Sequence, residues 1–281
     1  MRPLLTIVSF FAVVNSAAAR PRPDVDVPFV PTPLEVVNRM LDMADVGEGD
    51  LLFELSCGDG RITISAAGRG ARAIGIDKNS QRIKECRQNA QMAGVSKNTK
   101  FYQSDLFGVP LAQATVIAIY LMPDVNIQLR PKLFNELKPG SRVVSHDFHM
   151  GEWEPDSVVQ VRNSTVYMWV MPANFSGSWS WYHVDDPQTR FSLNISQHFQ
   201  QLAGEITSDT NPACVEKMTV SGDEIKIVLK DEEQKRIHLA GIITDDRIEG
   251  TITLFNGSKL KWHAVRENGT KKPLFFPEDG I

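Results

Sequence analysis

The sequence contains few cysteines and no dense run of charges of one sign. Its three cysteines, Cys57, Cys86 and Cys214, are too few and too scattered for a disulfide framework. Charged residues make up 23% of the chain with a net charge of −4, and no Lys/Arg block indicates a surface for nucleic acid. We therefore expect no nucleic acid as a partner. The hydrophobic content of 42% argues against disorder and predicts a folded core.

A long apolar run is also missing. The stretch from Leu4 to Val14 is too short to cross a bilayer, which takes about 20 apolar residues, so we expect no stable membrane span. It follows a basic start and precedes Ala17-Ala18-Ala19, a small-residue pattern typical of a signal-peptide cleavage site. We interpret residues 1–19 as a secretory signal, which predicts an exported protein, either periplasmic or secreted. An uncleaved amphipathic start is the alternative.

The most informative segment of the chain is Glu54-Leu55-Ser56-Cys57-Gly58-Asp59-Gly60-Arg61. It follows a short apolar stretch typical of a buried strand, residues 51–53, and precedes an apolar helical pattern that begins at Ile62. The two glycines let the backbone turn sharply and approach a ligand without a Cβ atom. A second strand, residues 73–76, ends at Asp77, whose carboxylate can accept both hydroxyls of a ribose. This succession predicts a nucleoside site at the carboxyl ends of a parallel sheet.

Two common nucleotide-binding motifs do not match this segment. Thr63 stands where the third glycine of G-x-G-x-x-G would be, and no G-K-[ST] sequence occurs in the chain. What remains, an acid followed by Gly58 and Gly60, resembles motif I of the class I S-adenosylmethionine-dependent methyltransferases. The resemblance covers roughly residues 28–172. Ser56 departs from the pattern, because the family usually has glycine at that position.

The resemblance implies S-adenosylmethionine as the cofactor and suggests which residues hold it. Glu54 and the amides from Gly58 to Gly60 would hold the methionine end, with Ser56 at the point of closest approach. Asp77 would bind the ribose. Asp105 and Leu106, which follow the third expected strand, would meet the adenine.

The segment Pro28-Phe29-Val30-Pro31-Thr32-Pro33 is similar to the lead-in of a lysine-methylating branch of this class. That branch includes the non-SET histone-lysine and the mitochondrial ATP-synthase lysine methyltransferases. Because the segment lies over the cofactor there, the resemblance implies cofactor contacts from Phe29 and Thr32. The residues alone allow another interpretation, in which Thr32-Pro33-Leu34-Glu35 is a capping box that begins a helix.

Methyl transfer requires an aligned nucleophile, and an amine nucleophile must also lose a proton. The candidates follow the strands expected at residues 114–120 and 142–146. Tyr120 and Asp124 could orient an amine, and Asp147 could accept its proton, with His146 as a further candidate. Because His146 and His149 have no third ligand nearby in the sequence, we predict no metal site.

The second half of the chain has a different pattern. From Trp179 onward, short alternating runs are separated by turn signals, among them Gly222-Asp223, Asp245-Asp246 and Asn256-Gly257. They predict an antiparallel meander of about eight strands that forms a small sandwich or barrel. Its tryptophans, Trp179, Trp181 and Trp262, either line a ligand cup or pack in the core. We recognise no family for this half.

The sequence therefore predicts an α/β fold, a Rossmann-like class I methyltransferase sheet, joined to an all-β antiparallel C-terminal domain. The expected parts are a signal peptide (1–19), an extended lead-in (20–31), a methyltransferase domain (32–172) and an antiparallel β domain (173–281). The predicted function is that of an exported S-adenosylmethionine-dependent methyltransferase, and the resemblance favours a protein lysine as its methyl acceptor. The alternative is a catalytically retired binding protein whose β domain holds a ligand or partner. The oligomeric state is not predicted.

Overall fold

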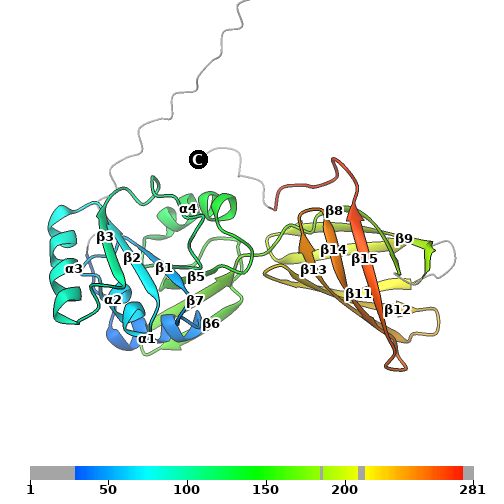
Figure 1. Cartoon of the computed structure of the whole chain (residues 1–281), viewed down its shortest axis with the longest axis horizontal. Helices are drawn as coiled ribbons and strands as arrows, with labels where there is room; N and C mark the ends of the chain where they lie inside the picture. The colour runs from blue at the N-terminus through cyan, green and yellow to red at the C-terminus, as the bar shows by residue number, and fades with distance from the viewer. Residues whose placement is uncertain (1–28, 184–185, 208–212, 275–281) are drawn as a thin grey trace, which may run out of the picture.

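The computed structural model describes residues 29–183, 186–207 and 213–274. These residues form two sheets that lie side by side along the long axis of the molecule (Figure 1). The predicted signal peptide and the lead-in up to residue 28 lie outside the described residues. In the part of the chain that the structure describes, no helix combines the length and the apolar character needed to cross a membrane.

The first sheet has seven strands in the order β3-β2-β1-β4-β5-β7-β6. Strands β1 to β5 are parallel, and β7 pairs antiparallel with both β5 and β6. The order reverses between β1 and β4, and sheets of this kind bind ligands outside the carboxyl ends of the strands at that point. The bounds are β1 Leu51–Leu55, β2 Arg72–Asp77, β3 Thr99–Gln103, β4 Val116–Ile119, β5 Arg142–His146, β6 Ser157–Val161 and β7 Ser164–Val170.

Helices cover both faces of this sheet, because successive side chains of a strand point to opposite faces. On one face, Leu51 and Phe53 of β1 pack in a cluster with α4 (Pro123–Glu136). On the other, Leu52 packs with α1 (Leu34–Met43) and α2 (Arg61–Gly68). Helix α3 (Ser80–Met92) packs on β3 through Cys86 and Phe101. The five residues of β1 are all buried, which agrees with the nearly continuous apolar sequence of a central parallel strand.

Helix α1 does not begin with the capping box that the sequence suggested. Its N-cap is Pro33, and no side chain caps it. Instead, the buried Thr32 places its Oγ1 3.1 Å from Nδ1 of His146, the last residue of β5. Glu35 forms an ion pair with Arg162. The capping interpretation is therefore wrong: a tertiary contact takes the threonine hydroxyl and ties the lead-in to the sheet.

The second sheet is antiparallel, with the order β10-β9-β8-β15-β14-β13-β12-β11. Its end strands β10 and β11 contact each other, so the sheet curls into a nearly closed barrel, one of the two expected forms. Trp179, Trp181 and Trp262 are buried in its apolar core, which confirms the packing interpretation. The bounds are β8 Gly177–His183, β9 Asp186–His198, β10 Gln201–Thr207, β11 Ala213–Ser221, β12 Glu224–Asp231, β13 Arg236–Thr244, β14 Arg247–Thr253 and β15 Lys259–Arg266.

Candidate active site

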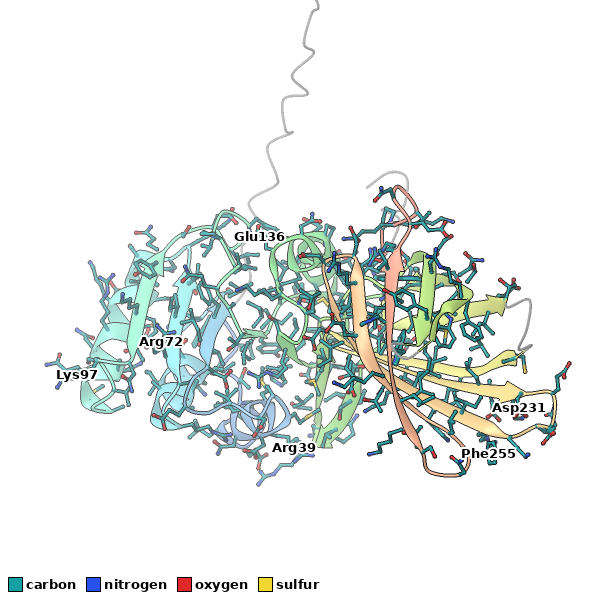
Figure 2. All side chains as sticks on the ribbon, turned by 45° about the vertical axis from the view of Figure 1, so that its right-hand side comes forward. Arg39, Arg72, Lys97, Glu136, Asp231 and Phe255 are labelled. Atoms are coloured by element: carbon teal, nitrogen blue, oxygen red, sulfur yellow. The ribbon has the colours of Figure 1, made fainter. Side chains whose placement is uncertain are left out.

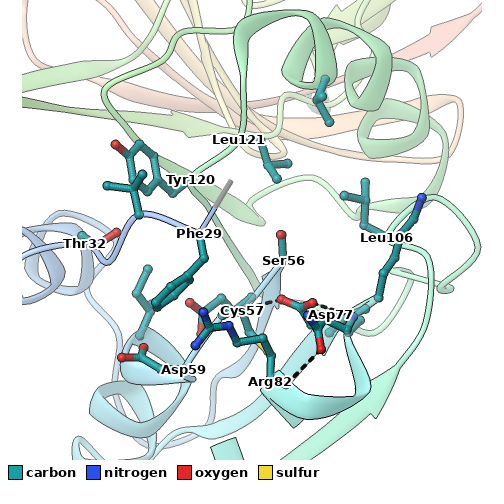
Figure 3. Close-up of a pocket in the computed structure, with 18 of the residues that line it drawn as sticks. Phe29, Thr32, Ser56, Cys57, Asp59, Asp77, Arg82, Leu106, Tyr120 and Leu121 are labelled. Carbon is teal, nitrogen blue, oxygen red and sulfur yellow. Dashed lines mark hydrogen bonds between the residues drawn. The ribbon is translucent and has the colours of Figure 1, made fainter. Parts of the chain in front are cut away.

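A cavity of about 580 Å³ lies at the carboxyl ends of β1, β2 and β4, under the lead-in (Figure 3). Its volume falls in the range of small-molecule sites, roughly 300–1,000 Å³. Three of the residues predicted from the sequence lie outside the lining, namely Gly60, Asp124 and Asp147. The predicted residues that line the cavity are Phe29, Thr32, Glu54, Ser56, Gly58, Asp77, Asp105, Leu106 and Tyr120.

The turn after β1 contains three residues with positive φ: Ser56 at 69°, Gly58 at 54° and Gly60 at 80°. Glycine adopts this left-handed conformation freely, whereas serine is strained in it. This explains why glycine suits the position of Ser56. A Cβ at Gly58 would lie 2.3 Å from the Phe29 ring, so only glycine lets the lead-in close over the turn. A Cβ at Gly60 would lie 3.0 Å from Cys86 Sγ, behind the cavity lining.

The amides of both glycines donate within the protein. The N–H of Gly58 donates to Oδ2 of Asp77 at 2.9 Å, and the N–H of Gly60 donates to the carbonyl of Cys57 at 2.8 Å. We expected these amides to hold the methionine end of the cofactor, but in the structure they hold the turn itself. The reason is geometric, since the left-handed turn directs them towards β2 and towards its own first residues.

Two carboxylates line the cavity at the ends of neighbouring strands. Asp77, the last residue of β2, accepts the N–H of Gly58 with one oxygen and the N–H of Asn79 at 2.8 Å with the other. These bonds fix the half-buried carboxylate at the cavity wall (Figure 3). Asp105, after β3, accepts the N–H of Phe107 at 2.8 Å and lies 3.4 Å from Lys78 Nζ.

Glu54 is the buried carboxyl of the site. Its Oε2 accepts the N–H of Thr63 at 2.8 Å and the Thr63 hydroxyl at 2.6 Å. Burial raises the pKa of Glu54 from its ordinary value of 4.5 to about 8, although both bonds from Thr63 oppose the rise. Thr63 thus does more than fill the position of the third glycine, because it supplies both hydrogen bonds to this carboxyl.

The donor set of the cavity suits S-adenosylmethionine. That molecule presents an ammonium group, a ribose diol and an adenine amine, all of which donate hydrogen bonds. Glu54, Asp77 and Asp105 present carboxylates along one cavity, at the ends of three successive strands. These residues would therefore hold the ammonium, the ribose and the adenine in that order.

Two arginines that the sequence did not single out attach the lead-in to the site. Arg61 pairs with Asp59, and its Nη1 donates to the carbonyl of Thr32 at 2.9 Å. Burial would raise the pKa of Asp59, but its bonds and charge contact with Arg61 hold it below the ordinary value. The guanidinium of Arg82 lies 3.9 Å from the ring centre of Phe29. Adjacency to the glycine turn was the only sequence signal for Arg61, and none pointed to Arg82.

The side of the cavity formed by β4 and α4 has no carboxylate in its lining. We call it the apolar wall and define it as Tyr120, Leu121, Met122, Val125, Gln128 and Phe148. The ring of Tyr120 lies between His146, with centroids 4.0 Å apart, and Phe148, at 6.1 Å. Burial, assisted by the charge of Asp147, raises the pKa of Tyr120, so its hydroxyl stays protonated at neutral pH. Gln128 and Phe148 were not anticipated from the sequence.

The other predicted catalytic residues face away from the cavity. Asp124 is exposed in the first turn of α4. Asp147 accepts the N–H of Thr165 at 2.8 Å, and its second oxygen lies 3.2 Å from His146 Nε2. His146 is buried, and burial lowers its pKa despite the nearby carboxylate of Asp147. These groups connect the lead-in, β5 and β7, and Asp147 does not reach the apolar wall.

Comparison with known proteins identifies the family. Residues 54–157 match the model of the ANTKMT methyltransferase domain. A protein-lysine N-methyltransferase of Saccharolobus islandicus (strain REY15A) is 43% identical over 151 residues, which cover 52% of this chain and 94% of that protein. The ATP synthase lysine N-methyltransferase of Homo sapiens is 33% identical over 162 residues, 58% of this chain and 69% of that protein.

Among solved structures, an RNA methyltransferase from Salinibacter ruber in complex with S-adenosyl-L-homocysteine is 51% identical, with a TM-score of 0.50. The match covers 50% of this chain and 93% of that chain. The predicted fold and the predicted cofactor are thereby confirmed. The chain belongs to the class I S-adenosylmethionine-dependent methyltransferases, in the lysine-methylating branch, and S-adenosylmethionine is its cofactor.

Proposed function

We propose that this enzyme transfers a methyl group from S-adenosylmethionine to the side-chain amine of a protein lysine. The observation that carries the proposal is the division of the cavity into a side with carboxylates and an apolar wall with one protonated tyrosine hydroxyl. The two relatives named as lysine N-methyltransferases support it, since each aligns over most of its own length.

The cofactor supplies a methyl group on a positively charged sulfur, so the protein has to position, desolvate and orient a neutral amine. Tyr120 and Phe148 give the apolar wall two roughly parallel rings, with an interplanar angle of 16°. Such rings accommodate an alkyl chain and exclude water. The Tyr120 hydroxyl has lone pairs that can accept an N–H of the amine, which leaves the nitrogen lone pair free to react.

The proton of the amine requires a separate route. Asp147 is bonded to Thr165 and faces His146, and Asp124 is exposed outside the cavity lining. A lysine amine would therefore lose its proton to solvent before it enters, rather than to a carboxylate of the apolar wall. This predicts a rate that rises with pH towards the ordinary pKa of lysine, about 10.4.

A methyl acceptor in RNA is the second candidate, because the structural relative with 51% identity is described as an RNA methyltransferase. Two features argue against it. The chain has no dense basic block and carries a net charge of −4, whereas RNA binding depends on phosphate neutralisation. The charged groups that line the cavity include four acids, Glu54, Asp59, Asp77 and Asp105, which would repel a polyanion.

The test uses the purified full chain with S-adenosylmethionine that carries a tritiated methyl group. The substrates are a library of peptides with one lysine each and, separately, total transfer and ribosomal RNA. Protein methylation predicts label in peptides and none in RNA, with acid hydrolysis yielding methylated lysine. Label in RNA alone would overturn the lysine assignment. Binding of S-adenosylhomocysteine without transfer to any substrate would favour the retired binding protein.

Export remains a proposal based on residues 1–19. Expression of the full chain in its host should give a mature protein that begins at Arg20 and is found outside the cytoplasm. Terminal sequencing of the isolated protein tests this directly, and an intact Met1 on all molecules would refute it. The result is independent of the methyl acceptor.

A further inference from the structure

The barrel inserts one side chain into the apolar core of the methyltransferase sheet. Phe199 lies in the turn between β9 and β10, is 2% exposed, and belongs to the same cluster as Phe53, Leu133 and Trp153. Its ring centroid lies 5.6 Å from that of Phe134 on α4 and 6.3 Å from that of Trp153. A turn between two strands of one domain is thus packed inside the core of the other.

The turn is held in a strained conformation. Phe199 has a φ of +53°, a region that a bulky residue adopts only when its surroundings require it. Its N–H donates to the carbonyl of Leu274 at 2.8 Å, and its own carbonyl accepts Nε2 of Gln197 at 2.7 Å. Gln200, the next residue, donates from Nε2 to the carbonyl of Glu154. Backbone and side-chain bonds therefore direct the ring into the interface.

Arg130 links this ring to the loop after β5. Its guanidinium lies 5.1 Å from the Phe199 ring centre, and its Nη1 donates to the carbonyl of Met150 at 3.0 Å. The residue is 6% exposed, so these contacts are shielded from water. One turn earlier on α4, the buried Asn126 donates from Nδ2 to the carbonyl of Phe148 at 3.2 Å.

The loop held in this way, residues 147–153, contributes Phe148 to the apolar wall beside Tyr120. A continuous set of contacts thus runs from the barrel through Phe199 and Arg130 to the cavity. The family match at residues 54–157 includes the loop and α4 but ends before the barrel. In this chain, the part outside the family match supplies a support for a wall that belongs to the matched part.

We propose that the β9–β10 turn braces the loop at residues 147–153, and that Phe199 is a positioning residue for the apolar wall. The statement rests on the proposed function only in taking that wall as the side that receives the acceptor. Loss of the brace should therefore change how the acceptor binds and leave cofactor binding intact, because Glu54, Asp77 and Asp105 lie on the other strands of the site.

The test compares Phe199→Ala with Phe255→Ala in the full chain. Phe255 is 61% exposed at the tip of the β14–β15 hairpin, so its truncation removes a barrel aromatic far from the interface (Figure 2). Hydrogen exchange of residues 147–153 should be about tenfold faster in Phe199→Ala and unchanged in Phe255→Ala. Phe199→Leu, which keeps apolar volume, should restore most of the protection and guards against a variant that fails to fold.

Two further measurements separate positioning from general destabilisation. Calorimetry should give the same affinity for S-adenosylhomocysteine, within about twofold, in wild type and in both Phe199 variants. With the best acceptor peptide from the library, Phe199→Ala should raise KM about fivefold, with a smaller change in kcat. Wild-type exchange rates in the Phe199→Ala loop, or equal acceleration in Phe255→Ala, would overturn the brace. The exchange measurement needs no acceptor, so it decides the matter even if the lysine assignment fails.

Discussion

Replacement of Glu54 by glutamine should make the protein less sensitive to pH. The buried carboxyl accepts two hydrogen bonds from Thr63 through one oxygen, and burial raises its pKa to about 8. It is therefore largely protonated at neutral pH in the folded protein. Glutamine has nearly the shape of a protonated glutamate, and its carbonyl oxygen can accept both bonds from Thr63.

The magnitude follows from the difference between the folded and unfolded pKa values. Because the folded protein holds the proton more tightly, the stabilisation is complete below pH 4.5 and is lost as the pH rises towards 8. At about 1.4 kcal/mol per pKa unit, the full window corresponds to a loss of about 5 kcal/mol at most. The Glu54→Gln variant does not titrate at this position, whereas all other groups are common to both proteins.

Urea unfolding at pH 5, 6, 7 and 8 measures the effect. Wild type and Glu54→Gln should differ by less than about 1 kcal/mol in unfolding free energy at pH 5. The variant should become progressively more stable than wild type above pH 6. Two curves that stay parallel across this range would refute the raised pKa of Glu54.

Cofactor binding gives an independent measurement of the same group. At pH 7, a carboxyl with a pKa of about 8 is roughly nine-tenths protonated, and a neighbouring ammonium favours the ionised form. Binding of S-adenosylhomocysteine to wild type should therefore release close to one proton, and binding to Glu54→Gln should release markedly less. Calorimetry in buffers of different ionisation enthalpy counts the protons. Equal counts in the two proteins would remove Glu54 from the ammonium site.

Three other predictions concern single residues of the site. Asp77→Ala should weaken the affinity for S-adenosylhomocysteine by about ten- to a hundredfold, because it loses a charged acceptor; an unchanged calorimetric titration would exclude the ribose contact. Ser56→Gly should raise the unfolding free energy by up to about 1 kcal/mol by relieving the φ of 69°, whereas Ser56→Ala, which keeps the strain, should not. The comparison is made by urea unfolding of the three proteins. Asp147→Asn should leave the rise of kcat/KM between pH 7 and 9 unchanged, since asparagine tolerates the φ of 60° and the carboxylate faces His146. A lost pH dependence in that variant would identify Asp147 as the base.

Much of the fold is predictable because its signals are local. A strand at residues 142–146 was expected, and β5 occupies Arg142–His146. In the barrel, Gly222 and Gly257 adopt positive φ in turns between successive strands, as their sequence context indicated. The choice between barrel and sandwich was not predictable, because it depends on how strongly the sheet curls until β10 meets β11.

The site divides in the same way. Residues of the glycine turn and the strand ends could be found because topology brings the carboxyl ends of parallel strands together. Gln128 and Phe148 line the cavity from a helix and from a loop, where no spacing rule applies. Thr32 satisfied a local capping pattern, yet its hydroxyl contacts His146, 114 residues further along the chain. Local chemistry cannot decide between two acceptors when one of them is supplied by folding.

Both departures from the expected fingerprint have structural explanations that leave the cavity intact. Thr63 stands where a dinucleotide fingerprint has glycine, and it donates two bonds to the buried Glu54, which shields this carboxyl from water within the core. Ser56 keeps the left-handed turn at a cost in backbone strain, and the turn still packs against Phe29 through Gly58. Substitutions that retire a site usually fill or distort it. Here they alter stability and a pKa, so they give no reason to regard the enzyme as inactive.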